Sequence, residues 1–203
     1  MPNWRITFDT NYAHLVEIHE TVLWLRDHVR PVALGHPRSW LGVWQSPSAR
    51  FIRDDEVLKE VPDDPTPPPP YLRDGDFSEY HGVLALSARA IAVLSPLISG
   101  AAELLPLQCP EGDFHLLNVV QVLDCLDRER ANITYWEDGT IRSVGQFAFH
   151  PGCLDDKHIF KLPLYNYSRI YVSQLFKDSV AQFALKGLRF EPAPWETPPL
   201  ELR

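Results

Sequence analysis

The sequence has few cysteines, few glycines and no surplus of basic residues. Three cysteines in 203 residues (Cys109, Cys125 and Cys153) are too few and too odd in number for a disulfide scaffold, so we expect reduced thiols in a cytosolic protein. Only 10 glycines stand against 19 prolines, and no glycine-rich phosphate-binding, nucleophile-elbow or His-Glu-x-x-His motif occurs. The 19 basic residues are outnumbered by 27 acidic ones, which disfavours nucleic-acid binding and favours a basic partner. We therefore predict no cofactor and no nucleic-acid partner.

Long apolar runs are also missing. The N-terminus lacks the charged and apolar regions of a secretory signal. Residues 82–102 carry a single charge, Arg89, but they also hold three serines and Pro96. An arginine near the centre of a membrane span costs about 3 kcal/mol on insertion scales. We expect a buried helix with its loop in this segment, no membrane partner, and a cytoplasmic location.

The first 60 residues predict a layer made of strands and a helix. Residues 4–8 form a strand-like run, and residues 40–44 indicate a further strand. Between them, apolar residues recur at steps of three and four, which is typical of a helix over residues 12–29. These residues are Leu15, Ile18, Val22, Leu25 and Val29.

A proline-rich segment divides the chain. Six of the nine residues 62–70 are proline, so residues 61–70 are expected to form an extended polyproline II strap. The strap is interpreted as a stiff linker or as a docking site for a proline-reading module. It separates the layer of residues 1–60 from a body of residues 71–203, within what we expect to be one compact domain.

The body contains an internal repeat. Ser87 opens one predicted helix, and Pro106 ends the strand that follows it; Ser173 and Pro192 do the same in a second copy. The serine-to-proline spacing is 19 residues in both copies (106 − 87 and 192 − 173). In each copy a glycine between helix and strand, Gly100 or Gly187, is predicted to stop the helix. We therefore expect two pseudo-symmetric helix–strand units.

Further strands are predicted between and beside the two units. They cover residues 114–122, 145–149, 158–162 and 169–172. Strands that mostly follow one another, with helices around them, indicate an α+β fold with a mostly antiparallel sheet and flanking helices.

Two groups of residues have some character of a metal site, and neither has a complete ligand set. His14, Glu17 and His19 do not converge on one helix face, because His19 lies five residues after His14. His150 and Cys153 have the two-residue gap of a zinc-ligand pair, but the sequence offers no second pair. We predict no metal site.

The most distinctive polar cluster is Asp124 and Asp127, with Arg128 and Arg130 beside them. In a helical turn, carboxylates three residues apart point the same way and can act as general acid and base. The alternative is a turn in which the aspartates cap backbone N–H groups and pair with the arginines. We favour the turn, since no nucleophile or cofactor motif lies nearby.

A set of motifs in the body resembles immunity protein family eleven of bacterial polymorphic-toxin systems. The resemblance covers roughly residues 70–195 in matching order. It is carried by Glu103-Leu-Leu-Pro, residues 113–120, residues 123–130, Ile159-Phe-Lys-Leu, residues 172–178 and residues 187–192. The resemblance implies a cytosolic, non-catalytic α+β protein that is encoded beside a toxin and binds it. The residues expected to specify the fold are Ser87, Asn118, Asp124, Asp127, Ser173, Gly187 and Pro192.

The leading functional hypothesis is therefore stoichiometric binding of a cognate toxin. A basic toxin would be met by acidic patches, which speed association. The patches that we predict to contact it are Asp54, Asp55, Glu56, Asp63, Asp64, Asp74, Asp76, Asp155 and Asp156. Two alternatives remain open: a small hydrolase or transferase that uses Asp124 and Asp127, and an adaptor that engages partners through its proline strap.

Overall fold

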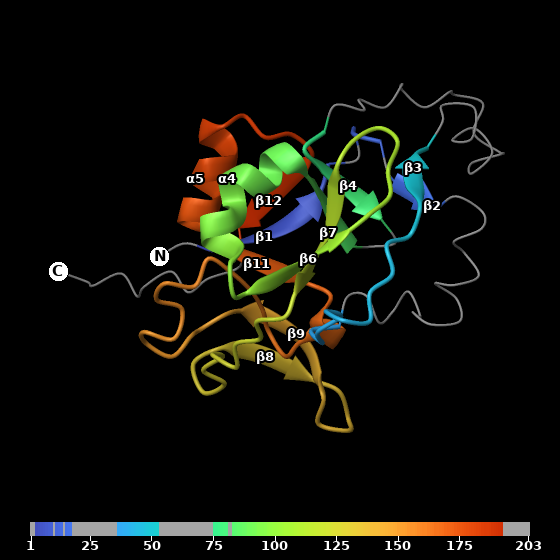
Figure 1. The fold of residues 1–203 in the computed structure, drawn as a ribbon. Helices are drawn as coiled ribbons and strands as arrows, with labels where there is room; N and C mark the ends of the chain where they lie inside the picture. The colour runs from blue at the N-terminus through green and yellow to red at the C-terminus, as the bar shows by residue number, and fades with distance from the viewer. Residues whose placement is uncertain are drawn as a thin grey trace, which may run out of the picture.

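The protein has an α+β fold in which antiparallel sheets carry two helices. The computed structural model describes residues 3–9, 11–13, 15–17, 36–52, 75–80 and 83–192. Within these residues, two four-stranded antiparallel sheets form the main body, and two smaller two-stranded sheets are attached to it (Figure 1). The predicted fold class is confirmed.

The first large sheet is built around one helix connection. Its strands are β4 (Phe77–Tyr80), β5 (Val83–Ser87), β6 (Ala102–Pro106) and β7 (Phe114–Val119), in the order β4-β5-β7-β6. Helix α4 (Ala88–Ile98) follows β5 directly and leads to β6. Since β5 and β6 both pair antiparallel with β7, they run parallel to each other with β7 between them.

The second large sheet repeats this arrangement. Its strands are β10 (Ile159–Lys161), β11 (Ile170–Ser173), β1 (Asn3–Phe8) and β12 (Leu188–Pro192), in the order β10-β11-β1-β12. Helix α5 (Gln174–Gln182) connects β11 to β12, and β1 pairs antiparallel with both. The prediction of two similar helix–strand units is confirmed, and the N-terminal strand β1 takes the place in the second sheet that β7 has in the first.

The two helices begin as the sequence predicts. The Ser87 side chain accepts a hydrogen bond from the Ala90 N–H, and the Ser173 side chain accepts one from the Phe176 N–H. This is the contact by which a serine N-cap satisfies a helix terminus. The strands β6 and β12 end at Pro106 and Pro192, also as predicted.

The two helices end differently. After α4, Gly100 has a φ of +73°, which confirms it as the helix stop. After α5, the residue with positive φ closest to the helix end is Ala184, at +48°, and Gly187 lies further on. The prediction that Gly187 stops the second helix is therefore wrong, and its role is described below.

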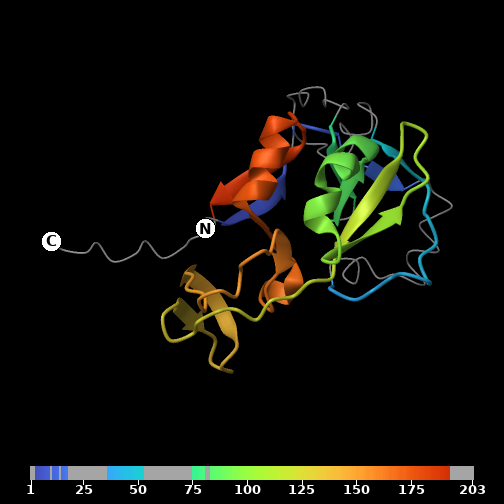
Figure 2. The same ribbon diagram turned by 60° about the vertical axis from the view of Figure 1, so that its left-hand side comes forward.

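Three apolar clusters form the core. The largest joins α4 and α5 to both large sheets through residues such as Leu94, Phe176 and Ile6. A second packs the first sheet against an N-terminal segment that includes β2 (Leu15–Glu17) and β3 (Ala49–Phe51). Figure 2 shows that β2 and β3 and the helices lie on different sides of the first sheet.

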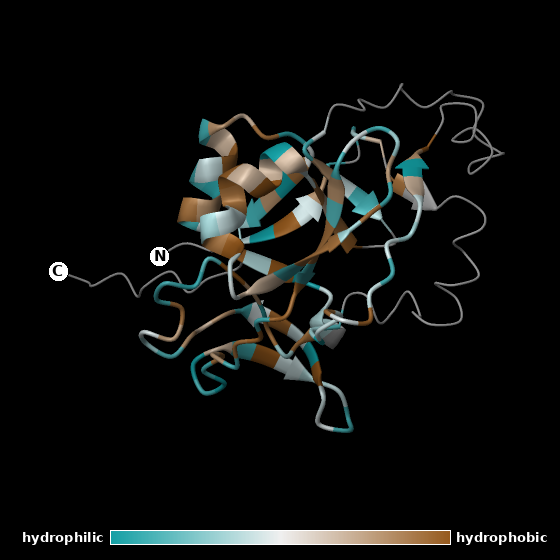
Figure 3. Cartoon of the chain, viewed as in Figure 1, coloured by the Kyte–Doolittle hydropathy of each residue, from teal (hydrophilic) through white to brown (hydrophobic). Residues whose placement is uncertain are grey.

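The third cluster belongs to a lobe beside the second sheet. This lobe contains β8 (Asn132–Tyr135), β9 (Ile141–Gln146) and a 3-10 helix at Tyr165–Tyr167. Its core is centred on Phe147, Phe160 and Tyr171. Hydrophobic residues are frequent in α4 and the neighbouring strands, α5 alternates between hydrophobic and hydrophilic residues, and the loops around β8 and β9 are largely hydrophilic (Figure 3).

Several predicted elements differ from the observed ones. Residues 15–17, assigned to a helix over residues 12–29, form strand β2, because Leu15 pairs with Phe51 of β3. Residues 40–44, predicted as a strand, form a turn in which the N–H groups of Val43 and Trp44 both donate to the Trp40 carbonyl. The strand predicted over residues 145–149 is β9, over residues 141–146. Residues 12 and 13 are not helical either, and residues 14 and 18–29 of the predicted helix lie outside the described residues, as does the strap of residues 61–70.

Candidate partner-binding surface

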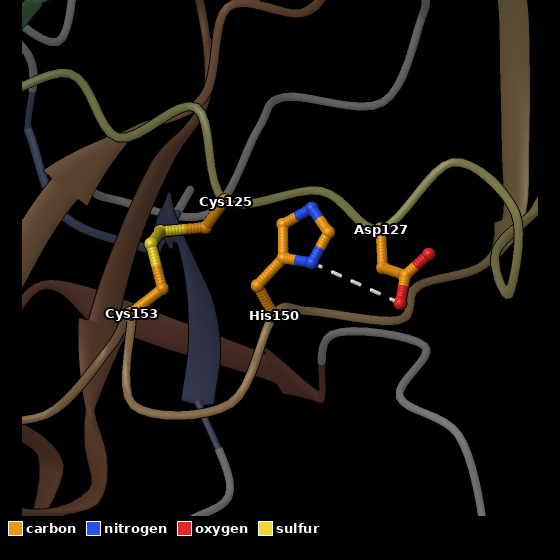
Figure 4. The surroundings of a disulfide bond; sticks show 4 residues. All are labelled: Cys125, Asp127, His150 and Cys153. Carbon is orange, nitrogen blue, oxygen red and sulfur yellow. Dashed lines mark ion pairs between the residues drawn. A yellow bond between two sulfur atoms is a disulfide. The ribbon is translucent and has the colours of Figure 1, made fainter.

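A disulfide between Cys125 and Cys153 closes one end of the β8–β9 lobe. Their Cα atoms are 5.8 Å apart, and 28 positions separate them in the chain (Figure 4). The pairing is set up by backbone hydrogen bonds: the Asp127 N–H donates to the Ala148 carbonyl at 2.9 Å, and the His150 N–H donates to the Cys125 carbonyl at 3.0 Å. The prediction of three reduced thiols is wrong, because a non-local strand contact brings two of them together.

The disulfide also bears on His150 and Cys153, which have the spacing of a zinc-ligand pair. Cys153 is bonded to sulfur and is not available as a thiolate ligand beside His150. Among the described residues, no group of three or more histidine, cysteine, aspartate or glutamate side chains could hold a metal ion. Cys109 is the free cysteine, half-buried, and burial together with the nearby Glu111 carboxylate raises its pKa to about 11.

The loop that Cys153 anchors carries two of the predicted partner-binding residues. Asp155 and Asp156 are both exposed. The loop is folded on itself: the Cys153 N–H donates to the His150 carbonyl at 3.3 Å, and the Asp155 N–H donates to the Gly152 carbonyl at 3.1 Å. The disulfide and these turns present the two carboxylates on a fixed support.

Asp124 and Asp127 do not form a helical pair. The chain around them makes two isolated β-bridges, Val122 with Lys161 and Leu126 with Phe149, and no helix. The shared helical face that the acid–base alternative requires is therefore not formed by residues 121–130.

The two carboxylates have separate surroundings. Asp127 Oδ1 accepts hydrogen bonds from the N–H groups of Glu129 and Arg130, each at 3.2 Å. Its Oδ2 lies 3.9 Å from His150 Nδ1, and the side chain points toward that ring (Figure 4). Asp124 is exposed. Asp127 therefore caps a turn, as the structural alternative predicts, and the hydrolase hypothesis loses its paired carboxylates.

Asp76 is a structural residue and not part of an exposed acidic patch. It is only 5 % exposed. Its Oδ1 accepts from the Ser87 hydroxyl at 3.1 Å, and its Oδ2 accepts from Arg89 Nη1 at 2.8 Å and from the Lys186 N–H at 3.0 Å. The prediction that Asp76 faces a partner is wrong, because its carboxylate ties the start of α4 to the segment that enters β12.

Gly187 lies beside this contact and allows the two chain segments to approach closely. Its φ is +107°, and a Cβ added there would lie 2.2 Å from the Phe77 carbonyl oxygen. The N–H groups of Asp76 and Phe77 both donate to the Lys186 carbonyl, at 2.8 and 3.0 Å. A side chain at Gly187 would therefore separate the two repeated units, and glycine is required by this close approach.

Asn118 belongs to a buried polar cluster on the first sheet. It lies opposite Glu103 in the β6–β7 register, and its Nδ2 donates to Glu103 Oε2 at 2.9 Å and to the Arg38 carbonyl at 2.8 Å. The Trp40 N–H donates to the same Glu103 oxygen at 2.9 Å, and the Ser39 hydroxyl donates to the other. Burial raises the pKa of Glu103, but these three hydrogen bonds lower it more, so its pKa lies below the ordinary glutamate value.

The remaining predicted partner-binding residues cannot be placed. They lie outside the described residues and are Asp54, Asp55, Glu56, Asp63, Asp64 and Asp74.

Within the described part of the chain, none of the helices has the length and hydrophobicity of a membrane span.

Comparison with known protein families identifies the family of this chain. Residues 76–194, more than half of the chain, match the immunity protein family Imm11. The chain belongs to the Imm11 immunity protein family. The resemblance seen in the sequence is thereby confirmed, and it implies a cognate toxin as partner. Immunity proteins are typically non-enzymatic binders. A search of curated proteins finds no match to the chain.

The Imm11 match begins at Asp76 and covers both helix–strand units. It therefore includes the Asp76–Gly187 contact, the disulfide and the whole β8–β9 lobe. It does not include β1, although β1 lies between β11 and β12 in the second sheet. The sequence prediction missed the structural role of Glu103, which entered only within a family motif, and the pairing of Cys125 with Cys153. The alternation of β6 places Glu103 on the same face as the buried Leu105, which is the signal that could have found it.

Proposed function

We propose that this protein binds a cognate toxin and neutralises it by forming a stoichiometric complex. The observation that carries the proposal is membership of the immunity protein family. Two carboxylates support it, because Asp76 and Asp127 accept hydrogen bonds that stabilise the fold and so have structural roles. Cys109 fits the same picture, since a thiol with a pKa of about 11 is a poor nucleophile near neutral pH.

The loop of residues 150–157 is the part of the described surface that we assign to the toxin's approach. Its exposed carboxylates, Asp155 and Asp156, add to a chain with a net charge of −8. Complementary charge of this kind accelerates encounter with a basic partner. Because the disulfide and the loop's own turns hold these groups in place, little conformational entropy is lost on binding.

The cytoplasmic location expected from the sequence was argued partly from three reduced cysteines, and two of these form a disulfide. Disulfides persist mainly in oxidising compartments, so the Cys125–Cys153 bond does not support a reducing one. The toxin contact is therefore best tested with oxidised protein.

The test is co-expression with the toxin of the neighbouring gene, scored by growth rescue and co-purification. Charge reversal of both loop carboxylates, Asp155→Lys with Asp156→Lys, is expected to slow association about 10-fold at low salt and less at high salt. The matched control reverses the exposed Asp113 and Asp178, which changes net charge equally but leaves the loop intact. Equal association rates for the two double variants would remove the loop from the interface, and failure of the unaltered protein to rescue growth would contradict the proposed function.

A further inference from the structure

The β8–β9 hairpin stands away from the two large sheets. Figures 1 and 2 show it at the far side of the lobe, with its connecting turn, residues 136–140, directed away from the body. Ile133 and Ile141 pack against the lobe's core, and Ile141 is the residue that directly follows the turn, so the hairpin is supported up to that point. The turn itself is built from exposed residues.

This turn is held by its own hydrogen bonds. The Trp136 N–H donates to the Thr140 carbonyl at 2.8 Å, and the Gly139 N–H donates to the Trp136 carbonyl at 3.0 Å. Asp138 Oδ1 accepts from the Thr140 N–H at 2.9 Å and from its hydroxyl at 2.6 Å. Gly139 takes a φ of +80°, which a residue with a side chain adopts only with strain. The shape of the turn is therefore fixed before any partner binds.

Two large aromatic side chains lie on this support and are exposed to solvent. Tyr135 is 49 % exposed and Trp136 is 55 % exposed. The Arg142 guanidinium lies over the Trp136 ring, 4.7 Å from its centroid, and orients it. Single exposed apolar residues are ordinary, but two adjacent aromatics on a rigid, protruding turn are typical of a binding surface.

We propose that the turn of residues 136–140 inserts Trp136 into an apolar pocket in a concave surface of the cognate toxin. This inference rests on the proposed function and names the residue that anchors the complex. Aromatic anchors of this kind supply most of the binding energy of specific interfaces. Glu137 and Asp138 flank the ring and face cationic groups at the rim of that pocket.

Charge decides between the toxin and two other occupants. Hydrogen bonds from the Thr140 hydroxyl and N–H hold the pKa of Asp138 below its usual value, and Glu137 adds a second acidic side chain to the tip. An anionic lipid surface would repel them. A second copy of this chain would bring the same acidic tip and a net charge of −8 against it. An apolar pocket with a basic rim, on another protein, complements both the Trp136 ring and the two acidic side chains.

The test compares two truncations in binding to the purified toxin. Trp136→Ala is expected to raise the dissociation rate about 10-fold or more without changing the melting temperature. The matched control, Leu175→Ala, removes a side chain of similar exposure, 52 %, from helix α5 and should stay within about twofold of the unaltered protein. Equal dissociation rates for the two variants, with tight binding by the unaltered protein, would overturn the hairpin proposal alone. Absence of binding by the unaltered protein would overturn the proposed function as well.

Cross-linking identifies the occupant directly. A photo-reactive phenylalanine derivative at position 136 is expected to join the chain to the toxin. A cross-link to a second copy of the chain, or capture by anionic vesicles in place of the toxin, would contradict the proposal. Charge reversal at Glu137 should slow association in a salt-dependent way, and the same change at the exposed Glu129 should not.

Discussion

At the scale of single residues, the most informative group is the buried Glu103 carboxylate. It receives hydrogen bonds from Ser39, Trp40 and Asn118, so one side chain joins β6, β7 and the N-terminal segment. Hydrogen bonds to a charged, buried acceptor are stronger than neutral ones, and leaving their donors unsatisfied costs about 1–3 kcal/mol. Glu103 therefore attaches residues 36–52 to the first sheet.

Replacing Glu103 by Gln is expected to lower the free energy of unfolding by about 2 kcal/mol, because an amide presents a donor to groups that already donate. Since the folded-state pKa is lowered, the carboxylate's contribution is present above the ordinary glutamate pKa and is lost as the pH falls below it. Urea unfolding between pH 7 and pH 3 should show a smaller loss of stability with acid in the variant. An exposed control, Glu129→Gln, should change neither quantity. A variant as stable as the unaltered protein would contradict this account.

Lys161 gives a pH dependence of the same sign at higher pH, because burial favours its neutral form. It is buried on β10, and burial lowers its pKa from 10.5 to about 8. Because the unfolded chain keeps this proton up to a higher pH, the free energy of unfolding should rise between about pH 8 and pH 10.5, by on the order of 3 kcal/mol. Denaturant titrations across this range should show the rise as a difference between the unaltered protein and Lys161→Met. Parallel pH profiles for the two proteins would show that Lys161 is not the group responsible.

The sequence predicts what a residue can do better than where it is placed. Ser87 and Ser173 could be assigned as N-caps because a cap acts on its own helix, within three residues. Asp76 and Asp155 look alike in the sequence, yet one is buried by contacts 110 positions away and the other is exposed. Only tertiary contacts distinguish them, so acidic residues alone could not define the partner-binding surface.

At the scale of elements, the repeated helix–strand unit was predictable from the sequence, but the central strand that pairs with each unit was not. Helix caps and proline stops recur at the same spacing, so the β5–α4–β6 and β11–α5–β12 units could be expected from local signals. The central strand of each unit comes from elsewhere: β7 follows the first unit, and β1 comes from the chain's beginning. Strand pairing across more than 160 positions, as between Trp4 and Val172, leaves no local signature.

Removal of residues 1–75 is therefore expected to prevent folding of the family-matched part. Without β1, strands β11 and β12 lose their common partner, and the apolar cluster loses Ile6. A fragment of residues 76–203 should show no cooperative thermal transition, and co-expression of residues 1–75 as a separate chain should restore one. A cooperative transition in the fragment alone would contradict the role assigned to β1.

The disulfide is the second element-scale feature with a measurable effect. Closing a loop of 28 positions restricts the unfolded chain and is expected to stabilise the protein by about 3 kcal/mol. Reduction, or Cys125→Ala with Cys153→Ala, should lower the denaturant midpoint accordingly, whereas Cys109→Ser should change it little. Thiol titration of the denatured, unreduced protein should find Cys109 alone. Three reactive thiols would contradict the bond.

At the scale of the whole molecule, the two repeated units meet at Asp76 and Gly187, and the β8–β9 lobe projects from the second unit (Figure 1). The buried polar groups hold this assembly together, while the acidic loop and the aromatic hairpin turn are exposed and are the surfaces that we propose for the partner. A rigid scaffold that presents charge for encounter and an aromatic anchor for retention is suited to stoichiometric inhibition.

The most direct test of this account is a titration of the toxin's activity with the purified, oxidised protein. Passive binding predicts that the activity falls linearly and reaches zero at an equimolar ratio, with one complex of matching mass on size-exclusion chromatography. Complete loss of the toxin's activity at ratios far below equimolar, with the protein recovered free, would contradict the account and require catalysis.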